Sequence, residues 1–394
     1  MIPYGRHTVN WRDALAVAWQ VKTKSLTQGH RIQEFEEKIA SYVGSKYAVA
    51  VSSATAGLHL ALLALNLPKG SQVSTSPISF VSTSNSILFA GLTPHFVDID
   101  SKNLNLSPAK FETSLKDNPK ISAVIPVHFA GLSCEMQAIH DSAQKHGVKV
   151  IEDAAHALGA NYTTGEKIGS CIFSDVTVFS FHPVKSVTTG EGGVITTNDY
   201  HIYQKLLQLR SHGINKQGID LLNPIHANSN GELNPWYYEM QTLGFHYRLT
   251  EIQAALGISQ MNRIDEFMHK RNEIRRYYDG QFQNSTLVTS AQKENREQSG
   301  NHIYPLRISF DKLKINRAQL FQELKNKGIG TQIHYIPIPM HPYYAELGYK
   351  MADLPNSMKY YAEALTVPMF PKLTKQNRTY VAKTLLEILN KNSL

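Results

Sequence analysis

The stretch Phe179-Ser-Phe-His-Pro-Val-Lys-Ser-Val-Thr-Thr-Gly-Glu-Gly-Gly193 decides how the rest of the sequence is interpreted. It predicts a buried strand over residues 176–181, a turn that carries Lys185, a glycine-rich reversal, and a second strand over residues 194–197. Burial disfavours the charged form of a lysine that stands at the end of such a strand. The neutral amine is then a nucleophile that can form a Schiff base at neutral pH. The alternative is a surface lysine in a hairpin, and the neighbouring motifs favour the first interpretation.

The composition of the 394 residues is that of an ordinary globular protein, with 42% apolar and 18% charged residues. This length allows a large core and two domains. The net charge of +8 suits anionic small molecules as well as nucleic acids. The densest basic cluster, Lys270, Arg271, Arg275 and Arg276, follows a helical pattern that includes Glu273, and we interpret it as a solvated helix face. No nucleic-acid partner is therefore expected.

The two cysteines, Cys134 and Cys171, form neither a metal-binding spacing nor a disulfide framework. This indicates a reducing compartment and predicts no metal site. Residues 1–6 contain no apolar signal segment, and no apolar run is long enough to span a membrane. We therefore expect a cytoplasmic protein without a membrane partner.

Strand and helix patterns alternate between residues 47 and 151. Nearly continuous apolar strands that alternate with helices predict an α/β fold, with a mostly parallel central sheet flanked by helices. The ligands of such sheets bind at the carboxyl ends of the strands. The predicted strands are Tyr47–Val51, Gln72–Thr75, 95–97, 123–127 and 148–151, and the predicted helices are 11–21, 31–43, 56–67, 80–90, 108–115 and 134–146.

The second half of the chain has a different composition. Residues 216–241 predict a long irregular segment, and residues 250–279 predict one long helix. Two short strands over 303–308 and 331–335 and two helices over 317–327 and 375–389 predict a smaller α+β domain. We expect a large domain with an N-terminal arm over residues 1–260 and a small C-terminal domain over residues 261–394.

Four motifs at predicted strand ends point to one cofactor. Ser52 to Gly57 offer small residues and a helix start to a phosphate, or they cap the helix. Asp153 could keep a ring nitrogen protonated, or it could cap a helix. Phe80 could stack on a flat ring, or it could lie in the core. Together with Lys185, this set contains the parts that hold pyridoxal phosphate.

The chain resembles the DegT/DnrJ/EryC1/StrS family of nucleotide-sugar aminotransferases, which are fold-type I pyridoxal-phosphate enzymes, over nearly its whole length. Five motifs together carry this resemblance and make it specific. They are Ser-Ala-Thr-Ala-Gly-Leu-His-Leu (53–60), Glu-Asp-Ala-Ala-His-Ala (152–157), Phe-Ser-Phe-His-Pro-Val-Lys (179–185), Thr-Gly-Glu-Gly-Gly (189–193) and Arg-Leu-Thr-Glu-Ile-Gln-Ala-Ala-Leu-Gly (248–257).

Shorter motifs are most similar to the family members that act in pseudaminic acid biosynthesis. They lie at residues 26–29, 76–80, 210–213, 236–241 and 334–337. The resemblance implies transfer of an amino group from L-glutamate to C4 of a UDP-linked 2-acetamido-2,6-dideoxy-4-ketohexose, with pyridoxamine phosphate as the intermediate form of the cofactor. The product would be UDP-4-amino-4,6-dideoxy-N-acetyl-β-L-altrosamine. Amination of another UDP- or dTDP-ketosugar at C4 or C3, as for bacillosamine or perosamine, remains the alternative.

The resemblance also implies roles for single residues around the cofactor. Lys185 would bond to the cofactor aldehyde and move the proton between the donor's Cα and the cofactor's C4′. Asp153 would pair with the pyridinium nitrogen, and Phe80 would stack on the ring. His156 stands where a polar side chain reaches the cofactor's ring hydroxyl.

The phosphate contacts implied by the resemblance come from two subunits of a homodimer. Thr55 and Ala56 would bind the phosphate through the helix start, and Ser180 would add a hydroxyl. The partner subunit would add the side chain of the third residue in Gly-Phe-His-Tyr-Arg (244–248). The family usually has asparagine there, whereas this chain has His246, which can still donate a hydrogen bond.

The substrate contacts implied by the resemblance come from the N-terminal arm and the small domain. They are Tyr4, Lys24, Thr27, Gln28, His334 and Tyr335.

Two other classes of protein compete with an aminotransferase. Dehydratases of the same family carry histidine where this chain has Lys185, and the lysine argues against them. A pyridoxal-phosphate-binding regulator would need an added DNA-binding domain, and we expect no room for one before residue 47. A purely structural role would leave the phosphate motif, Asp153 and Lys185 unexplained together.

Overall fold

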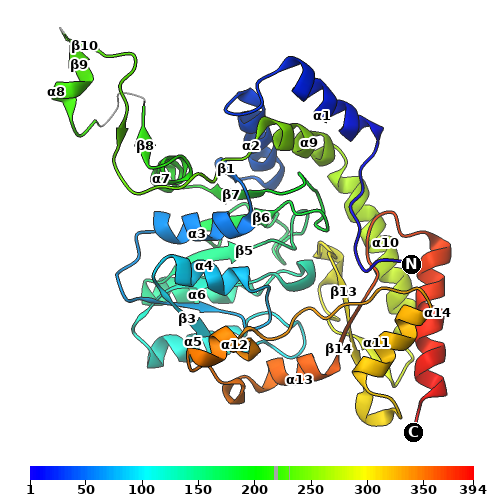
Figure 1. Cartoon of the computed structure of the whole chain (residues 1–394). Coiled ribbons are helices and arrows are strands. Elements are labelled where there is room, and N and C mark those ends of the chain that lie inside the picture. Colours follow the sequence, from blue (N-terminus) through cyan, green and yellow to red (C-terminus); the bar gives the residue numbers. More distant parts are fainter. Residues whose placement is uncertain (217–220, 230) are drawn as a thin grey trace.

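A seven-stranded sheet forms the centre of the protein (Figure 1). The computed structural model describes residues 1–216, 221–229 and 231–394. In the order of the sheet, the strands are β1 (Tyr47–Val51), β7 (Gly193–Thr197), β6 (Val176–Ser180), β5 (Lys149–Asp153), β4 (Ile121–Ile125), β2 (Gln72–Thr75) and β3 (Thr93–Phe96). The bounds of each predicted strand of this sheet agree with the observed bounds to within two residues, so these predictions are confirmed.

Strand β7 is the exception to the parallel arrangement. It runs antiparallel to its neighbours β1 and β6, whereas all other neighbouring strands of the sheet are parallel. The glycine-rich reversal after Lys185 causes this exception, because it returns the chain directly beside β6. The carboxyl ends of β1, β2, β5 and β6 therefore lie at the same edge of the sheet. The predicted, mostly parallel sheet is confirmed.

Helices cover both faces of this sheet (Figure 1). They include α2 (His30–Val43), α3 (Ala54–Ala64), α4 (Ser82–Phe89), α5 (Pro108–Asp117), α6 (Met136–His146) and α7 (Tyr200–Arg210). Apolar side chains of α2, α5 and α6 pack on one face, and those of α3, α4 and α7 pack on the other. The sequence analysis missed α7, although Asp199 caps it by accepting the amides of His201 and Ile202.

A smaller antiparallel sheet follows in the chain. Its strands are β12 (Val288–Ser290), β13 (Tyr304–Ile308) and β14 (Ala364–Val367), and its helices are α10 (Ile264–Phe282), α11 (Arg317–Asn326), α13 (Pro355–Glu363) and α14 (Lys375–Lys391). The short helix α12 (Pro342–Glu346) lies instead against the large sheet, where Tyr344 contacts Phe96 of β3 and donates to Asn85 of α4. The apolar core of the smaller sheet begins at Ile274, whereas the core around the large sheet extends to Phe267. This arrangement has the expected α+β character, and the boundary near residue 260 stays a prediction.

The single helix predicted over residues 250–279 is wrong. The structure has two helices, α9 (Glu251–Met261) and α10, and Arg263 before α10 is not helical (φ −123°, ψ 11°). The Arg263 guanidinium donates to the Thr8 carbonyl at 2.9 Å and to the Asp13 carboxylate at 3.2 Å. At this break, the Arg263 side chain therefore connects the start of α10 to the N-terminal helix α1 (Trp11–Thr23) and the residues before it.

The strand predicted over residues 331–335 is also wrong. Only Gln332 pairs there, in an isolated bridge with Thr366 of β14. The His334 side chain takes up the next contact, because its Nδ1 lies 3.0 Å from the Thr366 hydroxyl. This segment is therefore a loop held against β14 by the backbone bridge at Gln332 and by the His334 side chain.

The basic cluster on α10 is only half the solvated face that the sequence predicted, since the side chains of Lys270 and Arg276 are 44% and 63% exposed, whereas Arg271 and Arg275 are buried. Arg271 is only 1% exposed, and it donates to the carbonyl of His302 at 2.8 Å. Arg275 pairs with Asp279 at 3.1 Å. A helical charge pattern does not reveal which side chains reach across to a loop more than twenty residues away.

A long segment between α7 and α9 stands away from the rest of the protein (Figure 1). It contains β8 (Ile214–Asn215), α8 (Pro224–Ala227), β9 (Asn228–Ser229), β10 (Glu232–Leu233) and β11 (Glu239–Met240). The predicted irregular segment covers this region, and its residues 217–220 and 230 lie outside the described residues. Strand β11 pairs with β8, so the segment folds back on itself.

The state of the cysteines and the character of the helices were both predicted from the sequence. Cys134 and Cys171 are both buried and unpaired. Across the part of the chain that the structure describes, no helix combines the length and the apolar character needed to cross a bilayer.

The start of β7 lies against the start of α3. Gly193 pairs with Ser180 of β6 and with Val51 of β1. A Cβ atom on Gly193 would lie 2.6 Å from the carbonyl carbon of Ser53 and 2.7 Å from the amide nitrogen of Ala54. Both atoms belong to the backbone, so only glycine allows this close approach.

We predict that Gly193→Ala lowers the melting temperature by several degrees, because the new Cβ must displace the backbone where α3 begins. Gly280→Ala is the matched control, since Gly280 lies on α10 and a Cβ added there would have no atom within 4 Å. That control should leave stability unchanged or raise it by about 0.5–1 kcal/mol. Thermal unfolding of both variants tests the contact, and an undiminished melting temperature for Gly193→Ala would contradict it.

Candidate active site

A cavity of about 570 Å³ lies at the carboxyl ends of the central strands. Residues that follow β1, β2, β5 and β6 line it, together with a loop from the smaller sheet. Among the residues predicted for the site, those that line the cavity are Tyr4, Thr55, Phe80, Asp153, His156, Ser180, Lys185, His334 and Tyr335. The structure thus brings together side chains that are more than 300 residues apart in the sequence.

Lys185 lies in the turn that follows β6. Its amide donates to the carbonyl of His182 at 2.9 Å, which holds the turn closed. Burial lowers the pKa of its amine to about 8; the charge of Asp153 acts against this shift, and that of Arg271 adds to it. The neutral amine is therefore far more populated near physiological pH than in an ordinary lysine, and this is the form that a nucleophilic lysine requires.

Asp153 ends β5 and is 4% exposed. Its Oδ2 accepts the hydroxyl of Thr83 at 2.7 Å, and its Oδ1 accepts the amide of Ala155 at 3.1 Å. Ser79 contacts the same Thr83 hydroxyl at 2.7 Å. Two donors thus fix the carboxylate in the cavity wall, and its remaining lone pairs can accept a protonated ring nitrogen.

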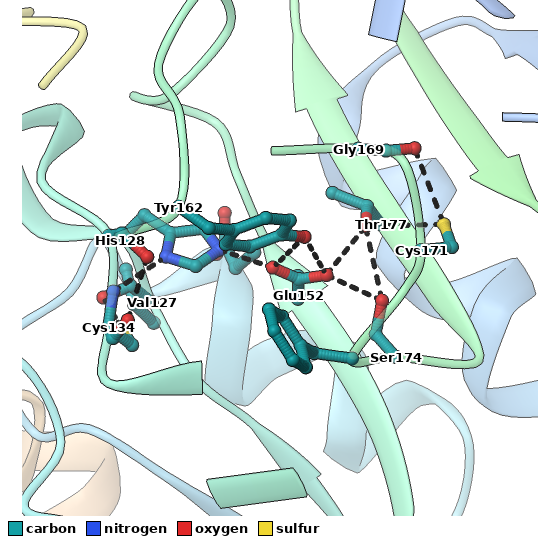
Figure 2. Close-up of polar contacts among 12 residues, drawn as sticks. Val127, His128, Cys134, Glu152, Tyr162, Gly169, Cys171, Ser174 and Thr177 are labelled. Carbon is teal, nitrogen blue, oxygen red and sulfur yellow. Dashed lines mark hydrogen bonds and ion pairs between the residues drawn. The ribbon is translucent and has the colours of Figure 1, made fainter. Parts of the chain in front are cut away.

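The preceding residue, Glu152, is fully buried in a polar network (Figure 2). Its carboxylate accepts from His128 Nε2 at 2.7 Å and from the hydroxyls of Tyr162, Ser174 and Thr177. Burial raises the pKa of Glu152, but the hydrogen bonds led by the one from His128 outweigh it and lower the pKa below its usual range.

The protonation state of His128 follows from this network. Its Nδ1 accepts the amide of Cys134 at 3.0 Å, so the ring proton sits on Nε2 and points at Glu152. Successive side chains of a strand point to opposite sides. The Glu152 network therefore fixes the end of β5 on the side of the strand that faces away from the cavity. Asp153, the next residue, faces the cavity.

One end of the cavity lies at the start of α3, where the sequence predicted the phosphate contacts. The Ser53 hydroxyl caps this helix by accepting the amide of Ala56 at 3.1 Å. The amides of Ala54 and Thr55 have no partner within the helix, and both residues line the cavity. Since the Ala56 amide is already engaged and Ala56 is not a lining residue, Ala54 takes its place as the candidate phosphate donor.

His156 lies beside the loop that carries Tyr335. Its Nε2 is 3.0 Å from the Tyr335 hydroxyl, and its Nδ1 is buried without a hydrogen-bond partner. Burial lowers the pKa of His156 well below its usual value, and the charges of Lys185, His334 and Arg271 act in the same direction. The imidazole is therefore neutral.

His302 is a cavity residue that the sequence analysis missed. Its ring centroid lies 4.4 Å from that of His156, and burial lowers its pKa well below the usual value. Its position depends on Arg271, which holds the His302 carbonyl. No motif around residue 302 signals this, because the contact joins two distant parts of the chain.

Five predicted site residues do not line this cavity. Ala56 is buried in α3, and Lys24, Thr27 and Gln28 lie exposed on the N-terminal arm. His246 is exposed, pairs with Ser211 in an isolated bridge, and has its ring 5.2 Å from that of His212. Their predicted roles toward phosphate and substrate stay predictions.

The residues present fit pyridoxal phosphate. The lysine is buried and its pKa is lowered to about 8, Asp153 can accept a protonated ring nitrogen, and free amides at the start of α3 can receive an anion. Phe80 lines the same cavity and is 59% exposed, which leaves its ring free to cover a flat group. These features define the cofactor site of a pyridoxal-phosphate enzyme.

The family model for the DegT/DnrJ/EryC1/StrS aminotransferases matches residues 9–386, and the chain belongs to this family. It is 38% identical to the spore coat polysaccharide biosynthesis protein SpsC of Bacillus subtilis, over 98% of this chain and 97% of SpsC. It is 35% identical to the UDP-4-amino-4,6-dideoxy-N-acetyl-beta-L-altrosamine transaminase of Campylobacter jejuni serotype O:23/36, over 99% of this chain and 98% of the transaminase.

Solved structures agree with this assignment. PseC of Helicobacter pylori, an aminotransferase involved in the biosynthesis of pseudoaminic acid, superposes with a TM-score of 0.90 at 30% identity, over 99% of both chains. A putative sugar aminotransferase of Streptococcus pneumoniae is known in PLP and PMP forms, with TM-scores of 0.88 and 0.89 at 26% and 27% identity, over at least 99% of each chain. The protein is therefore a pyridoxal-phosphate-dependent sugar aminotransferase, and the predicted fold class is confirmed.

We predict that the cofactor-free protein captures pyridoxal phosphate covalently at a rate that rises with pH and levels off above about pH 8. The neutral amine is the reactive form, and a solvated lysine would reach it only near its ordinary pKa of about 10.4. Stopped-flow absorbance over a pH series measures this rate, with Lys185→Ala as the variant that should show no covalent capture. A rate that still rises steadily to pH 10 would contradict the burial of this amine.

Proposed function

We propose that the protein transfers an amino group from L-glutamate to C4 of a UDP-linked 2-acetamido-2,6-dideoxy-4-ketohexose. The product is UDP-4-amino-4,6-dideoxy-N-acetyl-β-L-altrosamine, an intermediate of pseudaminic acid biosynthesis. The Campylobacter transaminase and the Helicobacter enzyme support this substrate through their similarity over nearly the whole chain.

One observation in the structure of this protein supports the proposal. Lys185, Asp153 and the start of α3 line the same cavity. Pyridoxal phosphate, when bound, supplies an electron sink for the bond that breaks at the donor's Cα. Asp153 would keep the ring nitrogen protonated, and the α3 amides would hold the phosphate. The Lys185 amine, whose pKa is about 8, would take the proton from the donor's Cα and deliver it to C4′ of the cofactor.

Another ketosugar is the second candidate. SpsC is 38% identical to this chain, and its description names polysaccharide biosynthesis without a particular sugar. Amination of a different UDP- or dTDP-ketosugar at C4 or C3 would use the same cofactor site, because the residues above act on the amino donor and the cofactor.

The homodimer that the sequence predicted is also part of the proposal. Trp11, Leu15 and Trp19 are spaced four residues apart on α1 and are each more than half exposed, which is unusual for an apolar stripe on a helix. Trp236 and Met240 expose further apolar surface on the segment that stands away from the body. A second copy of the chain would cover these surfaces, and its His246 would reach the phosphate end of the cavity.

The buried, unpaired cysteines support a reducing compartment and a cytoplasmic location.

The decisive assay offers the enzyme L-glutamate with a panel of UDP- and dTDP-linked 4-ketosugars and identifies the products by NMR. We expect the UDP-linked 2-acetamido-2,6-dideoxy-4-ketohexose to be turned over fastest and to gain its amine at C4. Lys185→Ala should lose turnover by several orders of magnitude, because the general base is removed. Preferred amination of another sugar, or of C3, would overturn the substrate assignment and leave the aminotransferase in place.

Mixing two defective variants tests the shared active site. Lys185→Ala and His246→Ala subunits should form heterodimers in which one site regains both native residues, so random mixing should restore about a quarter of wild-type activity. Lys185→Ala mixed with Asp153→Asn is the control, because both residues line the same cavity of one chain and no native site results. Equal activity in the two mixtures would contradict a site that contains the partner's His246.

A further inference from the structure

The carboxylate of Asp98 connects the large sheet to helix α13. Asp98 follows β3 and is 2% exposed. Its Oδ2 accepts the amide of Asn356 at 3.0 Å, and its Oδ1 accepts the amide and the hydroxyl of Ser357 at 3.0 Å and 2.6 Å. These two amides belong to the first turn of α13, where the helix itself offers no acceptor. Asp98 therefore caps this helix from a distant part of the chain.

The charge of Asp98 strengthens this cap. Burial raises the pKa of Asp98, but the hydrogen bonds from Lys110, Ser357 and Asn356 outweigh it and lower the pKa below its usual value. A carboxylate at the start of a helix is favoured by the helix dipole. Leu354, which precedes α13, provides no side-chain cap of its own. The start of α13 is therefore fixed against the large sheet by the Asp98 carboxylate.

Helix α13 in turn holds the cavity loop, which we define as residues 332–338. The fully buried Tyr360 donates its hydroxyl from α13 to the His334 carbonyl at 2.6 Å. The Tyr360 ring also packs on Phe129, with 5.9 Å between the ring centroids, and Tyr335 packs on the same phenylalanine at 6.3 Å. Helix α13 therefore supports the loop through a hydrogen bond and through a shared aromatic neighbour.

The supported loop forms part of the cavity wall. His334 and Tyr335 both line the cavity, and the His334 carbonyl belongs to the peptide bond between them. The hydrogen bond from Tyr360 therefore acts on both side chains. We propose that Asp98 is a positioning residue for the wall formed by His334 and Tyr335, and that it acts through α13 and Tyr360. This uses the prediction that the two side chains contact the ketosugar, and it holds for whichever ketosugar is the substrate.

Positioning and general stability have different kinetic effects. If the cavity loop is in place in only a fraction of the molecules, the apparent affinity for the sugar falls by that fraction, while the chemistry of the bound sugar is unchanged. Such a variant has a raised KM and an unchanged kcat. A variant that is merely less stable contains less folded enzyme, so its apparent kcat falls and its KM stays the same.

Steady-state kinetics of Asp98→Asn tests the proposal with the ketosugar that the wild-type enzyme turns over fastest. We expect KM for this sugar to rise about tenfold, as for the loss of one hydrogen bond to a charged group, with kcat within about twofold of wild type. A fall in kcat at unchanged KM would overturn the proposal. A substrate preference other than the one proposed above already shows with the wild-type enzyme, so the two failures are distinguishable.

Asp199→Asn is the matched control for the loss of a helix cap. Asp199 also caps a helix, α7, by accepting two backbone amides. This variant loses a comparable cap at a helix that packs on the large sheet, so its KM should stay within about twofold of wild type. An equal rise in KM for both variants would show that the effect is not specific to α13, and the proposal would fail.

The route through Tyr360 has its own test. Tyr360→Phe should also raise KM, and adding Asp98→Asn to it should raise KM by less than the product of the two single effects, because both changes release the same loop. Two effects that multiply would contradict this route. Hydrogen exchange of the cofactor-loaded enzyme should be faster in residues 332–338 for Asp98→Asn than for Asp199→Asn. Equal protection would overturn the proposal independently of any substrate.

Discussion

The amine of Lys185 lies in a cavity where burial lowers its pKa and the carboxylate of Asp153 raises it. The net pKa is about 8. The balance of these two effects gives an amine that is reactive near physiological pH. Desolvation without the carboxylate would lower the pKa further, and the carboxylate in bulk water would leave it near its ordinary value. The rest of the structure serves to hold these two groups at neighbouring strand ends.

Rigid surroundings keep both groups in place. The Glu152 network fixes the end of β5 with four donors to one buried carboxylate (Figure 2). The contact of Gly193 with the backbone of Ser53 and Ala54 brings the reversal after Lys185 against the start of α3. The start of α3 and the turn that carries Lys185 are thus joined by backbone contacts.

The sequence predicted those parts of the site that lie at strand ends, since alternating apolar patterns locate strands and the residue after each strand is then known. Lys185 and Asp153 were found in this way. Contacts between distant segments carry no such pattern. The burial of Arg271 against the carbonyl of His302, and the break at Arg263, depend on which loops meet in three dimensions. The same reason explains the missed His302, and the sequence also does not show that a cap bond to Ser53 engages the amide of Ala56.

Borohydride reduction of the cofactor-loaded enzyme, followed by proteolysis and mass spectrometry, tests most directly whether one buried amine carries the chemistry. The account predicts that the cofactor's mass is recovered on a single peptide and that fragmentation places it on Lys185. Recovery of the label on another lysine, or on none after full loading, would contradict it.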